Sequence, residues 1–103
     1  RSETGVETIS AAGLRRLLEG AEPPALLDVR EDVEVALEPM KGALRIPLRE
    51  VVARMDELDP GRLTVVVCAA GVLSARAIEA LKAAGYPGQF LNLEGGMRAW
   101  AAR

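Results

Sequence analysis

Two residue types that enzymes often use for catalysis are scarce in this sequence. Its 103 residues include no histidine and one cysteine, Cys68. These shortages exclude the usual Cys/His zinc sets, a Ser-His-Asp triad, a Cys-His dyad and an internal disulfide. We therefore expect no metal and no cofactor. The candidates for covalent chemistry are few, and Cys68 is the first of them.

Blocks of like charge and long apolar runs are also missing. The 13 basic and 15 acidic residues are scattered, and the formal net charge is -2. No segment could neutralise a run of phosphates, so nucleic-acid binding is disfavoured. No apolar run reaches the ~20 residues that span a bilayer, and the first ten residues lack the order of a signal peptide. We expect a cytoplasmic protein without a nucleic-acid or membrane partner; monomer and dimer both stay open.

What the sequence does contain is a regular alternation of strand and helix patterns. A chain of 103 residues, 50% of them hydrophobic, has room for one core, so we expect a single domain over residues 1–103. Strand patterns occupy residues 6–9, 25–29, 43–46, 63–67 and 90–93, and helical patterns follow each of them. This order predicts an α/β domain with a mainly parallel sheet of about five strands.

The strongest strand pattern is LTVVV, residues 63–67, which predicts a buried central strand. Ser10 is a candidate N-cap for a helix that stops at Gly20. Leu48, Val51, Val52, Met55 and Leu58 recur at helical spacing. Ser74 is the candidate N-cap of a helix over residues 75–84, with Gly85 as its stop.

Cys68 lies where the central strand gives way to a helix, and ligands of parallel sheets bind at such strand ends. Six residues, Cys68, Ala69, Ala70, Gly71, Val72 and Leu73, form the predicted loop before Ser74. Small side chains and a glycine let backbone N–H groups converge, and the following helix dipole stabilises a thiolate. The alternative is a small apolar residue that packs under the sheet.

Four segments, taken in order, resemble the signature segments of the rhodanese family of sulfurtransferases. They are LLDVRE, GALRIPL, CAAGVLS and LNLEGGMRAW, at residues 26–31, 42–48, 68–74 and 91–100. The resemblance covers about residues 6–101 and implies a small three-layer α/β/α fold. It also implies that Cys68 takes the outer sulfur of a donor as a persulfide, held by the N–H groups of residues 69–74, and passes it to a thiophilic acceptor.

The sequence departs from the family pattern at Leu73, where the family has arginine, so the loop has no charged side chain. This predicts weak turnover with thiosulfate and better use of a low-charge sulfur donor or a protein persulfide. Arg76 could reach back over the loop or be a solvated surface residue. Arg30 and Arg45 are candidates for the pocket mouth; Arg30 is more readily an ion-pair partner of Asp28 or Glu31, and Arg45 can equally be exposed.

Three other functions remain to be compared with sulfur transfer. A catalytically weak rhodanese-like domain could use the neutral loop as a docking surface or serve as a sulfur carrier. A phosphatase of related fold needs a loop arginine as a phosphate clamp, and neither Leu73 nor Ser74 supplies one. An arsenate or peroxide reductase would need an external thiol, because the sequence has no second cysteine.

Overall fold

The structure is a computed structural model that describes residues 5–102. Five strands form one sheet in the order β1-β5-β4-β2-β3, and all four neighbouring pairs are parallel. The strands are β1 (Thr8–Ile9), β2 (Ala25–Asp28), β3 (Leu44–Arg45), β4 (Thr64–Val67) and β5 (Phe90–Leu93). The predicted parallel sheet is confirmed, and β4 is its middle strand.

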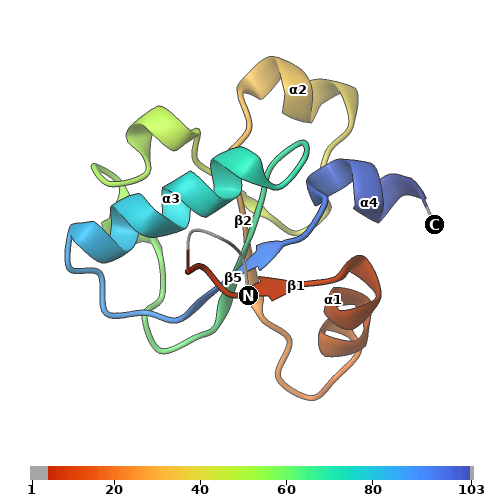
Figure 1. The fold of residues 1–103 in the computed structure, drawn as a ribbon, viewed down its shortest axis with the longest axis horizontal. Coiled ribbons are helices and arrows are strands. Elements are labelled where there is room, and N and C mark those ends of the chain that lie inside the picture. Colours follow the sequence, from red (N-terminus) through yellow and green to blue (C-terminus); the bar gives the residue numbers. More distant parts are fainter. Residues whose placement is uncertain (1–4, 103) are drawn as a thin grey trace.

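Helices cover both faces of the sheet. They are α1 (Ala11–Leu18), α2 (Asp32–Leu37), α3 (Val72–Ala83) and α4 (Gly96–Ala102), with two short 3-10 helices, η1 (Leu48–Glu50) and η2 (Met55–Glu57). In Figure 1, α3 lies on one side of the strands, and α1 and α4 lie together on the other. The three-layer α/β/α architecture is therefore confirmed.

The two layers of helices bury separate cores against the sheet. On the α3 side the buried residues include Leu27, Ile46, Val66, Ile78 and Leu81. On the α1 and α4 side they include Leu14, Leu26, Val65, Val67 and Met97. Neighbouring residues of β2 and β4 thus alternate between the two cores, as the pleat of a strand requires. Both faces are apolar, which explains the unbroken valines of β4.

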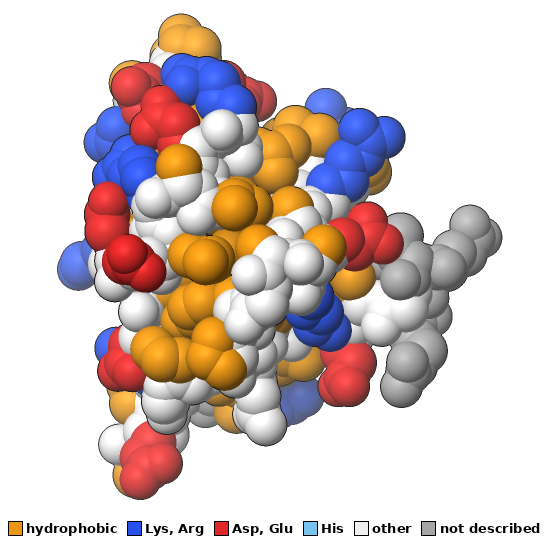
Figure 2. Space-filling model, turned by 90° about the vertical axis from the view of Figure 1, so that its left-hand side faces the viewer, with side chains coloured by type: hydrophobic (Ala, Val, Ile, Leu, Met, Phe, Trp, Pro, Cys, Tyr) orange, Lys and Arg blue, Asp and Glu red, His pale blue; other side chains and the backbone are white. Residues whose placement is uncertain are grey.

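One side of the molecule carries apolar side chains close to its surface. Leu48, Met55, Leu58 and Tyr86 are partly buried against the α3-side core. Figure 2 looks at the side of the molecule where the end of α3 and the η1–η2 segment lie, and it shows apolar side chains in the centre with charged ones around them. The η1–η2 segment therefore acts as a cover for this core.

Two helix predictions need correction. The segment 48–58 is not one α-helix but η1 and η2 joined by turns. Of its apolar side chains, Val52 is exposed, and Leu48, Val51, Met55 and Leu58 face the core. The helix after the cysteine begins at Val72 with Gly71 as its N-cap, so Ser74 lies inside the first turn and does not cap it. Gly71 adopts φ +93, a left-handed conformation that glycine reaches without strain.

Other local predictions are confirmed. Ser10 caps α1, because its Oγ accepts a hydrogen bond of 3.0 Å from the Gly13 N–H. The Gly95-Gly96 pair predicts the start of a last helix over residues 97–103, and α4 does open at Gly96. Trp100 packs partly buried against the α1-side core, and the predicted end of the helix at Arg103 lies outside the described residues. Within residues 5–102, no helix has the length and apolar character needed to cross a membrane.

Candidate active site

Cys68 follows β4 directly, at the edge of the sheet where the strands end, which we call the carboxyl edge. The starts of α2, α3 and α4 lie at this same edge (Figure 1). Parallel pairing places Asp28, the last residue of β2, opposite Val67, the last residue of β4. The sequence therefore brings Cys68 to the position where open parallel sheets bind ligands.

The sulfur of Cys68 is held by two neighbours from the start of α3. The Gly71 N–H donates to Sγ over 3.0 Å, and Ser74 Oγ lies 3.2 Å from Sγ. Only 2% of the Cys68 surface is exposed. Among the described contacts one loop amide points at the sulfur, where sequence reasoning expected a series of them. The sulfur is thus enclosed, with a backbone donor and a hydroxyl as its polar contacts.

Asn92 on β5 completes this arrangement, and the sequence analysis did not single it out. The Ser74 hydroxyl donates to Asn92 Oδ1, and Asn92 Nδ2 donates to the Gly71 carbonyl over 2.9 Å. Together with the two contacts to Sγ, these bonds close a ring through Cys68, Ser74, Asn92 and Gly71. A signal existed in the sequence: Asn92 is the one polar residue within the buried strand FLNL.

The backbone of the sulfur loop is fixed from the other side by α4. The Met97 N–H donates to the Cys68 carbonyl over 2.8 Å, and the Arg98 N–H donates to the Ala69 carbonyl over 3.1 Å. A Cβ on Gly96 would lie 2.7 Å from the Ala69 carbonyl oxygen, so only glycine permits this approach. The Gly95-Gly96 pair of the sequence therefore serves to bring α4 onto the loop.

Asp28 and Arg30 form a buried ion pair with each other. Arg30 Nη2 lies 2.8 Å from Asp28 Oδ2 and also donates to the Glu38 carbonyl over 2.8 Å. The hydrogen bond to Asp28 raises the pKa of Arg30, against the opposing effect of burial. The ion-pair interpretation of Arg30 is confirmed, and its guanidinium is occupied in fixing the turn after β2.

The remaining candidate cations do not contact the sulfur. Arg45 is exposed and pairs with Asp32 over 3.1 Å. Arg76 lies on the exposed face of α3, and no ion pair involves it in the part of the chain that the structure describes. Leu73 is 43% exposed in the first turn of α3, beside the exposed Val72. The exposed side chains of the first turn of α3 are therefore apolar, and the loop of residues 68–74 has no charged side chain.

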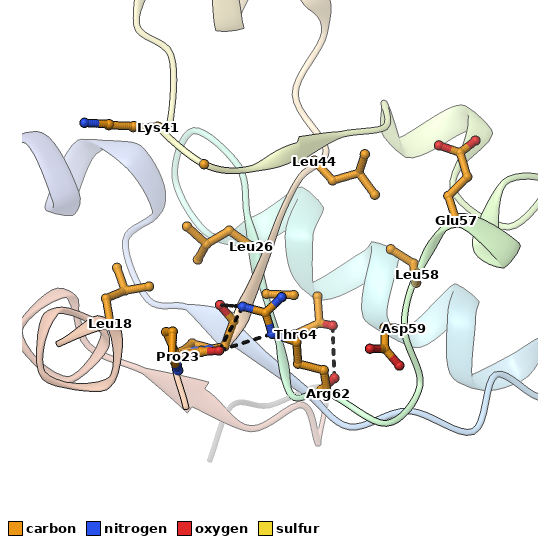
Figure 3. A pocket seen from close by; sticks show the side chains of 13 residues that line it. Leu18, Pro23, Leu26, Lys41, Leu44, Glu57, Leu58, Asp59, Arg62 and Thr64 are labelled. Atoms are coloured by element: carbon orange, nitrogen blue, oxygen red, sulfur yellow. Dashed lines mark hydrogen bonds between the residues drawn. The ribbon is translucent and has the colours of Figure 1, made fainter. Parts of the chain in front are cut away.

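A candidate cavity lies at the opposite edge, where the strands begin, which we call the amino edge. It has a volume of about 540 Å³, and Leu26, Leu44, Thr64 and Arg62 are among the residues that line it. Figure 3 shows the Arg62 guanidinium bonded to the carbonyl of Pro23 at its wall. It contains neither Cys68 nor Ser74, and residues 5–102 hold no cluster of side chains able to bind a metal ion.

The protein is an α/β protein with a five-stranded parallel sheet and an enclosed cysteine at the end of the middle strand. Comparison with known proteins shows which family has this arrangement. The chain matches the model of the rhodanese-like domain over residues 10–103 and belongs to this family. A sulfurtransferase of Allochromatium vinosum is 35% identical over 96 residues, covering 93% of this chain and 89% of that protein. The resemblance found in the sequence is confirmed.

Solved structures agree with this assignment. The crystal structure of a rhodanese-like domain protein from Staphylococcus aureus has a TM-score of 0.85 and 32% sequence identity, covering 92% of this chain and 91% of that one. A thiosulfate sulfurtransferase from Pseudomonas aeruginosa has a TM-score of 0.86 and 28% identity, but this chain covers only 19% of it. The family thus occurs both as a small protein and within larger ones.

Proposed function

We propose that the protein transfers sulfane sulfur through a persulfide on Cys68. The Cys68 thiolate attacks the outer sulfur of the donor and forms a new S–S bond. The donor's own bond to that sulfur breaks, and its electron pair leaves with the departing group. A thiophilic acceptor then attacks the outer sulfur and releases the thiolate again, so each half-reaction exchanges one bond for another without net oxidation.

The observation that carries this proposal is the Gly71 N–H that points at the sulfur of Cys68. A cysteine that only fills space needs no such donor, because its thiol behaves as a small hydrophobe. A backbone N–H held by the rigid start of α3 stabilises negative charge on sulfur without any side-chain cation. The contact is therefore what a nucleophilic thiolate requires and what a packing residue does not.

The enclosure of Cys68 restricts the sulfur donor. With 2% of the residue exposed, reaction requires residues 69–71 to move aside or the donor to enter by its outermost sulfur alone. The loop of residues 68–74 has no charged side chain, because Leu73 stands at the arginine position of the family pattern. A dianion such as thiosulfate therefore gains little from this loop. A low-charge donor or a protein persulfide suits this site better.

Mass spectrometry of the intact protein after incubation with sulfur donors tests the proposal. The expected result is a mass increase of one sulfur atom that disappears in Cys68→Ser and is removed by a thiol acceptor. The donors are thiosulfate, a neutral organic trisulfide and a persulfidated protein. An adduct that persists in Cys68→Ser contradicts the role of this residue.

A rhodanese-like docking domain without sulfur transfer is the second candidate, and the low exposure of Cys68 together with the uncharged loop of residues 68–74 favours it. The two functions differ in one measurement. If none of the three donors loads the unaltered protein, while iodoacetamide in denaturant shows that the thiol is intact, the docking function replaces the proposed one.

A further inference from the structure

The direction of each hydrogen bond in the ring around Cys68 can be assigned from chemistry alone. The Gly71 carbonyl can only accept, so the amide nitrogen of Asn92 must face it, as the 2.9 Å contact shows. Asn92 Oδ1 then faces Ser74 and can also only accept, so the Ser74 hydroxyl hydrogen points to Asn92. Asn92 is 4% exposed, which leaves water little access as an alternative partner.

This assignment fixes what Ser74 can offer to the sulfur. A hydroxyl has one hydrogen, and here Asn92 holds it, so Ser74 presents a lone pair toward Sγ at 3.2 Å. A lone pair is a good partner for the S–H of a thiol and a poor one for a thiolate. When a base in the solvent removes the Cys68 proton, the thiolate is stabilised most if the Ser74 hydroxyl turns and donates a hydrogen bond to the sulfur. Asn92 and the thiolate thus compete for the same hydrogen.

We propose that Asn92 is a positioning residue whose side-chain oxygen holds the Ser74 hydroxyl hydrogen away from Cys68 in the thiol state and yields it to the sulfur in the anionic state. The inference rests on the proposed nucleophilic role of Cys68. It assigns Asn92 a place in the site without contact to the sulfur. Its second bond, to the Gly71 carbonyl, keeps the Gly71 N–H directed at the sulfur throughout.

The test compares four proteins: the unaltered chain, Asn92→Leu, Ser74→Ala and the double variant. The measurement is the rate of Cys68 alkylation by iodoacetamide as a function of pH, which reports the thiolate without requiring sulfur transfer. Removing Asn92 has two effects, since it frees the hydroxyl and also releases the Gly71 carbonyl. Only the first needs Ser74, so the double-variant comparison isolates it.

With Ser74 present, Asn92→Leu is expected to lower the pH midpoint of alkylation by about one pH unit more than it does in the Ser74→Ala background. One pH unit corresponds to the free energy of about one hydrogen bond to an ion. Equal shifts in the two backgrounds, or a difference of opposite sign, overturn the proposal. A structural role alone moves both backgrounds alike. The charged residues on the segments next to the site are the same in all four proteins: Asp28 and Arg30 at the end of β2, Arg49 and Glu50 in η1, Arg76 in α3, Glu94 just before α4 and Arg98 in α4.

Circular dichroism and Trp100 fluorescence check that each variant folds. If Asn92→Leu does not fold, Asn92→Ala replaces it, because the smaller side chain leaves room for water to meet the Gly71 carbonyl. Sulfur loading is measured on the same samples. A protein that shows the predicted difference in alkylation but loads no sulfur keeps this inference and loses the proposed function, so the two failures are distinguishable.

Discussion

The two edges of the sheet differ in cavity volume, in the charge of their side chains and in the direction of their polar groups. The amino edge has a hollow of about 540 Å³ lined by leucines and by the charged Lys41, Glu57, Asp59 and Arg62. The carboxyl edge has an enclosed sulfur, a closed ring of hydrogen bonds and no charged side chain in that ring. If cavity size decided, the amino edge would be the better binding site. The carboxyl edge is the better candidate for chemistry, because two of its polar groups are directed at one atom, the sulfur of Cys68.

This difference teaches where to look for chemistry in such a fold. The charged groups of the hollow at the amino edge serve local contacts. Arg62 binds the Pro23 and Pro24 carbonyls, Glu57 pairs with Arg54, and Asp59 accepts from the Gly61 N–H. At the carboxyl edge each helix begins with N–H groups that lack intrahelical partners, and α3 and α4 direct theirs at Cys68 and its carbonyl. Directed donors, not volume, mark the candidate site.

The largest contrast is expected between the two arginines that fix the edges. Arg30→Met leaves the Asp28 carboxylate buried without its partner and lowers the free energy of unfolding by about 3–5 kcal/mol. Arg62→Met at the amino edge removes hydrogen bonds to the Pro23 and Pro24 carbonyls from an exposed side chain, at a cost of about 1 kcal/mol. Urea unfolding followed by Trp100 fluorescence measures both. Equal losses would contradict the buried role of Arg30.

A second contrast uses two glycines with positive φ, Gly96 at 58° and Gly42 at 82°. Alanine at either position pays about 1 kcal/mol for the left-handed backbone. At Gly42 the added Cβ meets open space, whereas at Gly96 it collides with the Ala69 backbone and pushes α4 away. Gly96→Ala is therefore expected to lose about 2 kcal/mol more than Gly42→Ala, within the usual cost of overpacking.

Sulfur loading of the same pair sharpens the result. Displacing α4 disturbs the loop that positions Cys68, so Gly96→Ala is expected to load sulfur several-fold more slowly, while Gly42→Ala loads at the unaltered rate. Mass spectrometry of the intact protein over time gives both rates. If Gly96→Ala is destabilised yet loads normally, α4 supports the fold without shaping the site.

A third contrast places one new positive charge at each edge. Leu73 and Leu44 are similarly exposed, at 43% and 39%. Leu73→Arg puts the charge at the rim of the sulfur loop and is expected to raise thiosulfate turnover several-fold, because the donor is a dianion. Leu44→Arg puts it in the amino-edge hollow and leaves turnover unchanged. Steady-state kinetics at low salt measures both, and no gain in Leu73→Arg shows that charge is not the limitation.

The smallest effect concerns Tyr86, whose buried hydroxyl has no hydrogen-bond partner within the described residues. Burial, and secondarily the charge of Asp59, raise the pKa of Tyr86. The neutral form of Tyr86 is therefore favoured in the folded protein. Its contribution to the free energy of unfolding is fully present below the ordinary tyrosine pKa of about 10 and is lost as the pH rises above it. Tyr86→Phe is expected to gain up to about 1 kcal/mol and to weaken the alkaline loss, as measured by urea unfolding at several pH values.

Much of the fold follows from the sequence, and the reason is periodicity. Valines 65 to 67 predicted a central strand, and the alternation of strands with helices predicted parallel pairing, because each pattern reflects a local geometry. The helix prediction for the segment 48–58 was wrong, because its apolar spacing suits an α-helix as well as the two 3-10 helices that occur. Periodicity reports which side chains face inward but not the exact helix type.

The site was predicted less completely than the fold. Cys68 and its loop stand out by residue type, but Asn92 becomes meaningful only when β5 pairs with β4 and brings it beside the loop. The start of α3 was misplaced because Ser74 has the side chain of an N-cap, whereas its hydroxyl is used in the ring with Asn92. Contacts between distant segments decide both points, and a single sequence does not display them.

The hydrogen bonds from α4 to the sulfur loop join residues that are far apart in the sequence. The carbonyls of Cys68 and Ala69 receive their partners from Met97 and Arg98, a much later stretch of the chain. A growing polypeptide that has already produced the thiol lacks these donors until α4 emerges and docks. Until then the sulfur loop lacks the two hydrogen bonds that fix its backbone from the α4 side.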